Sequence, residues 1–117
     1  MGYTDLDVWK ESRRLVKITY DLTTTFPKDE VYGLTNQMRR RGISIPSNIA
    51  KGCGRRTSVD TIKFSHITRG SLYELETQIF LALDQSYVSD SEFQLIIEQI
   101  KNCKRLLNGF IKYGSLK

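Results

Sequence analysis

Apolar residues recur at steps of three and four positions in four separate runs along this chain of 117 residues. That spacing puts them on one face of an α-helix, whereas a half-buried strand needs strict alternation. No alternating run, repeat or low-complexity segment competes with the helical pattern. The sequence therefore predicts an all-α fold, an up-and-down antiparallel four-helix bundle. Because so short a chain supports only one hydrophobic core, we expect residues 1–117 to form a single domain.

Start and stop signals separate the four runs. The first helix is expected to end just before Pro27, because the residue that precedes a proline is pushed out of the helical region. Thr57 is followed three positions later by Asp60, and Ser89 in the same way by Glu92. Both pairs have the spacing of a capping box, so they predict where the third and fourth helices begin.

The second run contains a proline. Pro46 cannot donate a hydrogen bond to the carbonyl of residue 42, and its ring crowds that turn. We therefore expect one helix kinked at Pro46, with Gly42 leaving space for the bend, rather than two helices. The Gly52-Cys53-Gly54 sequence resembles a phosphate loop only in outline, because no strand precedes it, and its glycines predict a left-handed helix C-cap instead. The core positions of this helix are Leu34, Met38, Gly42, Ile45, Ile49 and Cys53.

Small residues interrupt the apolar stripe of the third helix. Gly70 and Ser71 stand near its middle, where a glycine costs about 1 kcal/mol of helix propensity. A close crossing by another helix would explain them. The predicted core stripe is Phe64, Ile67, Ser71, Leu75, Ile79 and Ala82, widened by Leu72 and Leu83.

The net charge of +5 is concentrated in one segment. Between Arg39 and Arg69, eight basic residues stand against one acid, whereas the rest of the chain has 10 basic and 12 acidic residues. Such asymmetry favours a polyanionic partner such as RNA or DNA, although basic residues on a bundle can also form a solvated face. Arg55 and Arg56 also precede a predicted helix N-terminus, which attracts anions. The candidate nucleic-acid-binding residues are Arg39, Arg40, Arg41, Lys51, Arg55, Arg56 and Lys63.

The second helix carries a second line of residues, which is rotated by roughly a third of the helix circumference from the core stripe. A helix with two apolar faces has two neighbours, so this line belongs either to a deeply buried helix or to an interface with another subunit. On the third helix, Glu74 and Glu76 flank the core stripe on opposite sides and diverge too far for acid–base catalysis. We expect them to pair with arginines, first of all Arg39 or Arg40. The candidate interface residues are Tyr32, Arg39, Ile43, Ala50, Glu74 and Glu76.

The sequence indicates neither a catalytic nor a metal site. His66 is the only histidine, and no cysteine or carboxylate at metal-ligand spacing accompanies it. Cys53 and Cys103 are not in a CxxC pair, so we expect free thiols in a reducing cytoplasm. We also expect no enzymatic activity, no cofactor and, in the absence of a long uncharged apolar stretch, no membrane segment.

Three motifs carry a resemblance that covers nearly the whole chain. YGLTNQMRR begins at Tyr32, SIPSNIAKGCGR at Ser44 and GSLYELETQ at Gly70, in that order. Together with the opening DLDVWKESRRLV, they are similar to the four-helix-bundle family named for intervening sequences of the large-subunit ribosomal RNA genes. The chain departs from the usual family pattern at Arg41, Gly42, Lys51 and Cys53.

The resemblance implies a bundle that assembles as a ring-shaped homopentamer, and it implies no catalytic residue. A related bundle, the accessory protein of diversity-generating retroelements, is similar in ring architecture and turns a basic surface towards nucleic acid and a reverse transcriptase. Two functions are therefore expected as alternatives. One is a nucleic-acid-binding accessory protein in which an oligomer multiplies the basic segment. The other is a structural or protein-binding homo-oligomeric scaffold without nucleic-acid binding.

Overall fold

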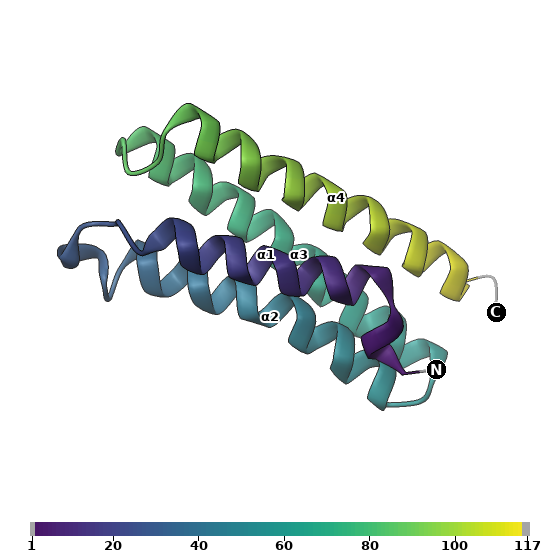
Figure 1. Ribbon diagram of the computed structural model, residues 1–117. Helices are drawn as coiled ribbons and strands as arrows, with labels where there is room; N and C mark the ends of the chain where they lie inside the picture. Colours follow the sequence, from purple (N-terminus) through teal and green to yellow (C-terminus); the bar gives the residue numbers. More distant parts are fainter. Residues whose placement is uncertain (1, 116–117) are drawn as a thin grey trace.

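Four long helices make up the computed structural model, which describes residues 2–115 (Figure 1). The helices run up and down in chain order and lie antiparallel to their neighbours, so that both chain ends are at the same end of the bundle. Each helix packs on two others, and within the described residues no Cα atoms of the diagonal helix pairs come within 8 Å of each other. The helices are α1 (Asp7–Thr23), α2 (Leu34–Gly54), α3 (Ser58–Asp84) and α4 (Asp90–Ser115), with one-turn 3-10 helices η1 (Tyr3–Asp5) and η2 (Lys28–Glu30). The predicted all-α four-helix bundle is confirmed.

The core runs along the axis of a molecule that measures 45 × 24 × 20 Å. Every helix contributes side chains with no exposed surface, among them Leu15 of α1, Ile45 of α2, Leu75 of α3 and Ile100 of α4. These are positions of the three-and-four pattern, because that spacing turns one stripe of each helix inward.

The predicted helix starts are confirmed by hydrogen bonds. Thr57 Oγ1 accepts a bond from the Asp60 amide at 3.1 Å, which caps α3. At α4, the Glu92 amide donates to Ser89 Oγ at 3.1 Å, and the Ser89 amide donates to the Glu92 carboxylate at 2.8 Å. Each bond satisfies an amide that has no partner inside the helix.

Polar side chains occupy part of the core along the first half of α3, and the predicted stripe is wrong there. Ser65 and Thr68 are buried, whereas Ile67 is 43% exposed and Phe64 is only half-buried. The hydroxyls donate to the carbonyls four residues earlier, at 2.7 Å for Ser65 and 2.9 Å for Thr68, so their burial leaves no donor unpaired.

The glycines act differently from the prediction. Gly52 and Gly54 lie inside α2, and no described glycine has a positive φ, so the left-handed glycine cap is wrong. A Cβ on Gly52 would come within 3.1 Å of Phe64 Cβ, which shows that this glycine permits the close contact with α3. Gly70 is exposed with open space around it, so it marks no helix crossing. The left-handed residue of the turn is Arg56, with φ 64°.

Pro46 lies inside α2, which continues from Leu34 to Gly54 as one helix. One helix rather than two is therefore confirmed, and the kink at Pro46 remains a prediction. Gly42 is buried, and its nearest foreign atoms belong to the side chain of Thr19 on α1, at 3.7 Å from an added Cβ. A Cβ at this position would meet the Thr19 side chain at an ordinary van der Waals distance, so the packing of α1 on α2 does not itself require a glycine here.

Candidate nucleic-acid interface

The antiparallel topology gathers basic residues from all four helices at one end of the bundle. We call residues 2–15, 44–71 and 103–115 the basic end, because these segments hold 11 basic and 4 acidic residues. Residues 16–43 and 72–102 form the acidic end, with 6 basic and 9 acidic residues. The α2–α3 turn and both chain ends lie at the basic end (Figure 1). The bundle is therefore electrically asymmetric along its axis, which the charge of the linear segment alone did not reveal.

Two cations lie close to one aromatic ring at the basic end. The guanidinium carbon of Arg55 is 5.4 Å from the centroid of the Phe64 ring, and the ammonium of Lys63 is 5.8 Å from it. Lys51 and Arg56 are exposed nearby in sequence, on the last turn of α2 and in the turn that follows. None of these four basic residues forms an ion pair within residues 2–115. Four of the seven predicted nucleic-acid-binding residues thus share one end of the molecule with their charge uncompensated.

The three consecutive arginines of α2 lie elsewhere. Arg40 is separated from Lys51 by 11 residues of helix, or about 16 Å at 1.5 Å per residue. Arg39 donates from Nε to Thr23 Oγ1 at 2.8 Å and stacks on the Tyr20 ring at 4.6 Å. Arg39–Arg41 therefore lie apart from the other four predicted residues. They also point in different directions from one another, because an α-helix turns successive side chains around its axis.

Glu74 pairs with an arginine of α2, as predicted, although with Arg41 rather than Arg39 or Arg40, and the partner of Glu76 is a lysine. Glu74 forms an ion pair with Arg41, whose Nε is 3.1 Å away but not aligned for a hydrogen bond. Glu76 accepts a bond from Lys104 of α4 at 2.8 Å. The pairing with Arg39 or Arg40 is wrong within the chain, since Glu74 faces α2 from one side of α3 and Glu76 faces α4 from the other. Their predicted divergence is confirmed.

Basic residues of α1 and α4 were missed by the sequence reading. Lys10, Arg13, Arg105 and Lys112 belong to the basic end, although none lies in the segment with the charge excess. Their three-and-four spacing resembles that of any solvated helix face. The antiparallel topology, which was itself predicted, was the signal that could have placed them beside the α2–α3 turn.

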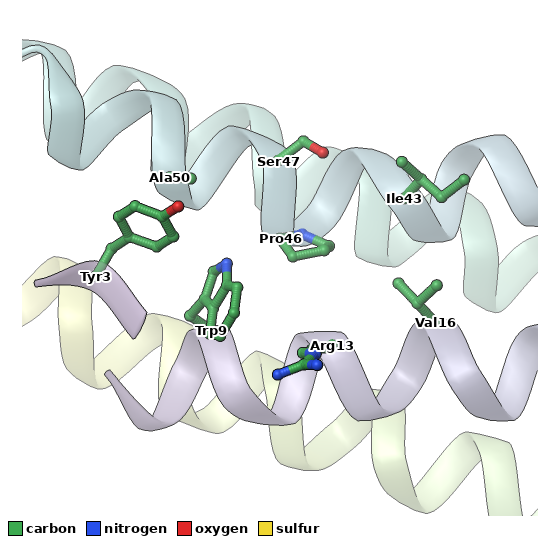
Figure 2. Close-up of a pocket in the computed structure, with 8 residues that line it drawn as sticks. All are labelled: Tyr3, Trp9, Arg13, Val16, Ile43, Pro46, Ser47 and Ala50. Carbon is green, nitrogen blue, oxygen red and sulfur yellow. The ribbon is translucent and has the colours of Figure 1, made fainter. Parts of the chain in front are cut away.

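A shallow groove lies between α1 and α2, and it contains part of the predicted interface. Ile43, which is 42% exposed, and Ala50 line this groove of about 370 Å³. Figure 2 shows Trp9 reaching from α1 towards Pro46, and Val16 facing Ile43. Tyr32 is 91% exposed and precedes α2, so it does not belong to the helical line in which it was placed.

The thiols and the histidine offer no reactive centre. Burial raises the pKa of Cys103 to about 12 and also raises that of Cys53, so both thiols remain protonated near neutral pH. Both cysteines are free, and His66 is exposed on α3. Among the described residues, no three side chains of the metal-binding types converge. None of the described helices combines the length and apolar character that a membrane span requires.

Comparison with known proteins agrees with this architecture. The model of the 23S rRNA-intervening sequence protein family matches residues 4–109. The chain belongs to that family. A crystal structure is also similar: a protein of unknown function from the S23 ribosomal protein family of Bacteroides thetaiotaomicron superimposes with a TM-score of 0.80 at 20% identity. The match covers 89% of this chain and 97% of the other, and it shows a shared fold. No curated protein matches the chain.

Proposed function

We propose that this family member is a non-enzymatic accessory protein of the cytoplasm that binds RNA or DNA through its basic end. The observation that supports this most is the group formed by Lys51, Arg55, Arg56 and Lys63, none of which forms an ion pair with a carboxylate of residues 2–115. Unpaired cations on a surface release the counterions of phosphates on binding, which drives association with a polyanion. Arg39 and Arg41 are left out of the proposed site, because Thr23, Tyr20 and Glu74 engage them.

Salt dependence is the direct test. Binding of a labelled oligonucleotide is measured by fluorescence anisotropy between 50 and 200 mM salt, conditions over which several phosphate contacts weaken affinity by orders of magnitude. Replacing both Arg55 and Arg56 with Ser should lower affinity at every salt concentration and reduce the logarithmic salt slope by about 2.

Arg40→Ser is the matched control, because this exposed arginine lies on the same helix as Lys51 but at the acidic end. It should change the slope little. No measurable binding at 50 mM salt, or an equal loss from Arg40→Ser and from the double variant, would refute the proposal.

Self-association is the second function that an observation favours. The groove between α1 and α2 leaves apolar side chains of Trp9, Val16 and Ile43 in contact with solvent. Burying them against another copy would build the homopentameric scaffold implied by the family resemblance, and a ring would multiply the basic end. Ile43→Asp should then reduce the mass measured by light scattering to that of a monomer, whereas a 13.5 kDa wild-type particle would exclude the assembly.

A further inference from the structure

A second cavity opens at the basic end, between the first turns of α3, the end of α4 and the residue before α1. Its volume is about 370 Å³, within the range typical of small-molecule sites. Ile62 lines the cavity and points about 200° around α3 from Phe64. This wall of the cavity therefore faces away from the Phe64 ring and the two cations beside it. Arg56 also lines the cavity, and its neighbour Arg55 reaches that ring. The two arginines therefore connect the cavity with the cationic surface.

The cavity has two walls of different chemistry. Leu6 and Phe110 provide an apolar wall, and α3 provides hydroxyl groups. Thr61 Oγ1 shares its proton between the Gly52 carbonyl at 3.0 Å and the Thr57 carbonyl at 2.9 Å, and Ser65 Oγ donates to the Thr61 carbonyl at 2.7 Å, so towards a ligand both oxygens can act only as acceptors. A planar group with apolar faces and N–H donors at its edge matches such walls, and a nucleobase, with its amino or ring N–H groups, is a group of this kind.

We propose that this cavity receives one unpaired nucleobase of a single-stranded nucleic acid, while Arg56 contacts the adjoining phosphate. The proposal rests on the function proposed above and adds a ligand class to it. A base can enter only after leaving the stack, which a single strand permits at little cost and a duplex opposes. The charge of the basic end supplies the attraction for the backbone on both sides of the inserted base.

Abasic oligonucleotides separate the base from its backbone. Single strands of RNA and of DNA, their duplexes, and strands with abasic residues in place of nucleotides are compared by anisotropy with the wild-type protein. We expect the natural single strand to bind at least about fivefold more tightly than the abasic strand or the duplex, as for insertion and stacking of one base. If only the RNA strand or only the DNA strand bound tightly, that result would support the cavity and would show which nucleic acid it receives.

Filling the cavity tests the location. Ile62→Trp should abolish the difference between natural and abasic strands without abolishing binding. If Ile62→Trp fails to fold, Ser58→Trp fills the cavity from the exposed first position of α3 and should have the same effect on binding. Val59→Trp is the matched control, because Val59 is 78% exposed and does not line the cavity, and this variant should keep the full difference.

The outcomes distinguish the two proposals. If natural, abasic and duplex ligands all bind equally well to the wild type, the cavity proposal fails and the basic end remains a phosphate-binding surface. A difference that persists in both filled variants would place the base elsewhere and would also overturn the proposal. If none of the ligands binds, the proposed function fails together with the cavity.

Discussion

The two ends of the bundle differ in their core as well as in their charge, and α3 shows both differences. In its acidic-end half it buries Leu72, Leu75 and Ile79, whereas in its basic-end half it buries Ser65 and Thr68. Large apolar side chains stabilise the acidic-end half by removing more surface from water. The small hydroxyl side chains of the basic-end half bury less apolar surface and therefore add less hydrophobic stabilisation. The end that carries the proposed interface is thus also the end with the weaker core.

The largest expected effect tests this difference in the core directly. Leu75→Ala should lower the free energy of unfolding by about 2–5 kcal/mol, because Leu75 is fully buried and the deletion leaves a cavity. Thr68→Val keeps the volume and removes only a hydroxyl that bonds within its own helix, so the loss should stay below about 1 kcal/mol. Urea denaturation measures both. Equal losses would show that the two halves of α3 contribute alike.

The next effect concerns the close approach of α2 to α3. Gly52→Ala should cost about 1–3 kcal/mol, because the new Cβ would lie 3.1 Å from Phe64 Cβ and 3.3 Å from the backbone of Thr61. Gly70→Ala is the matched control: it adds the same methyl group in open space and should raise stability by about 0.5–1 kcal/mol. Unfolding in urea compares the two. A neutral Gly52→Ala would mean that the helices separate without penalty.

At the acidic end, a carboxylate links the two connecting segments. Glu30 accepts bonds from the Leu34 amide at 3.1 Å and from the Tyr87 hydroxyl at 2.7 Å, and both bonds lower its pKa from the ordinary 4.5. A lowered pKa means that this stabilisation is present above about pH 4.5 and is lost as the pH falls through the lowered value. Glu30→Gln should therefore flatten the acid limb of a plot of thermal midpoint against pH.

Tyr87→Phe serves as the matched variant, because it removes the hydrogen bond that lowers the pKa of Glu30 most and leaves the carboxylate in place. It should flatten the same limb by a smaller amount. An acid limb of unchanged steepness in Glu30→Gln would show that other groups dominate the acid response.

The fold was predictable because its signals are local. The three-and-four spacing and the capping residues at Thr57 and Ser89 depend on neighbours in the chain, and they located the helices. The partners of Glu74 and Glu76 depend on which helix lies on each side of α3, and residue spacing alone does not contain that information. Hydroxyl burial at Ser65 was equally hidden, since a serine that bonds to its own helix resembles a solvated serine.

The candidate site was predictable only in part. The basic segment included the α2–α3 turn of the proposed site, but it also included Arg39 and Arg41, whose partners come from α1 and α3. The cavity lined by Ile62 and Phe110 joins residues nearly 50 positions apart. Such a cavity depends on how the helices pack together, so no sequence motif predicts it.

The smallest effect distinguishes the ion pairs of α3. Arg41 and Glu74 keep side-chain exposures of 37% and 57%, so solvent screens their attraction and the coupling energy should be about 0.2–1 kcal/mol. Lys104 and Glu76 are only 18% and 23% exposed, and their atoms approach to 2.8 Å, so their coupling should be the larger of the two. Double-mutant cycles with glutamine at the acids and methionine at the bases, measured at low and high salt, give both values. If the Arg41–Glu74 pair proved stronger and less sensitive to salt, Arg41 would be held more firmly than these distances and exposures imply. The acidic end, where Arg39 and Arg41 have partners, would then differ more sharply from the α2–α3 turn, where the arginines form no ion pair within residues 2–115.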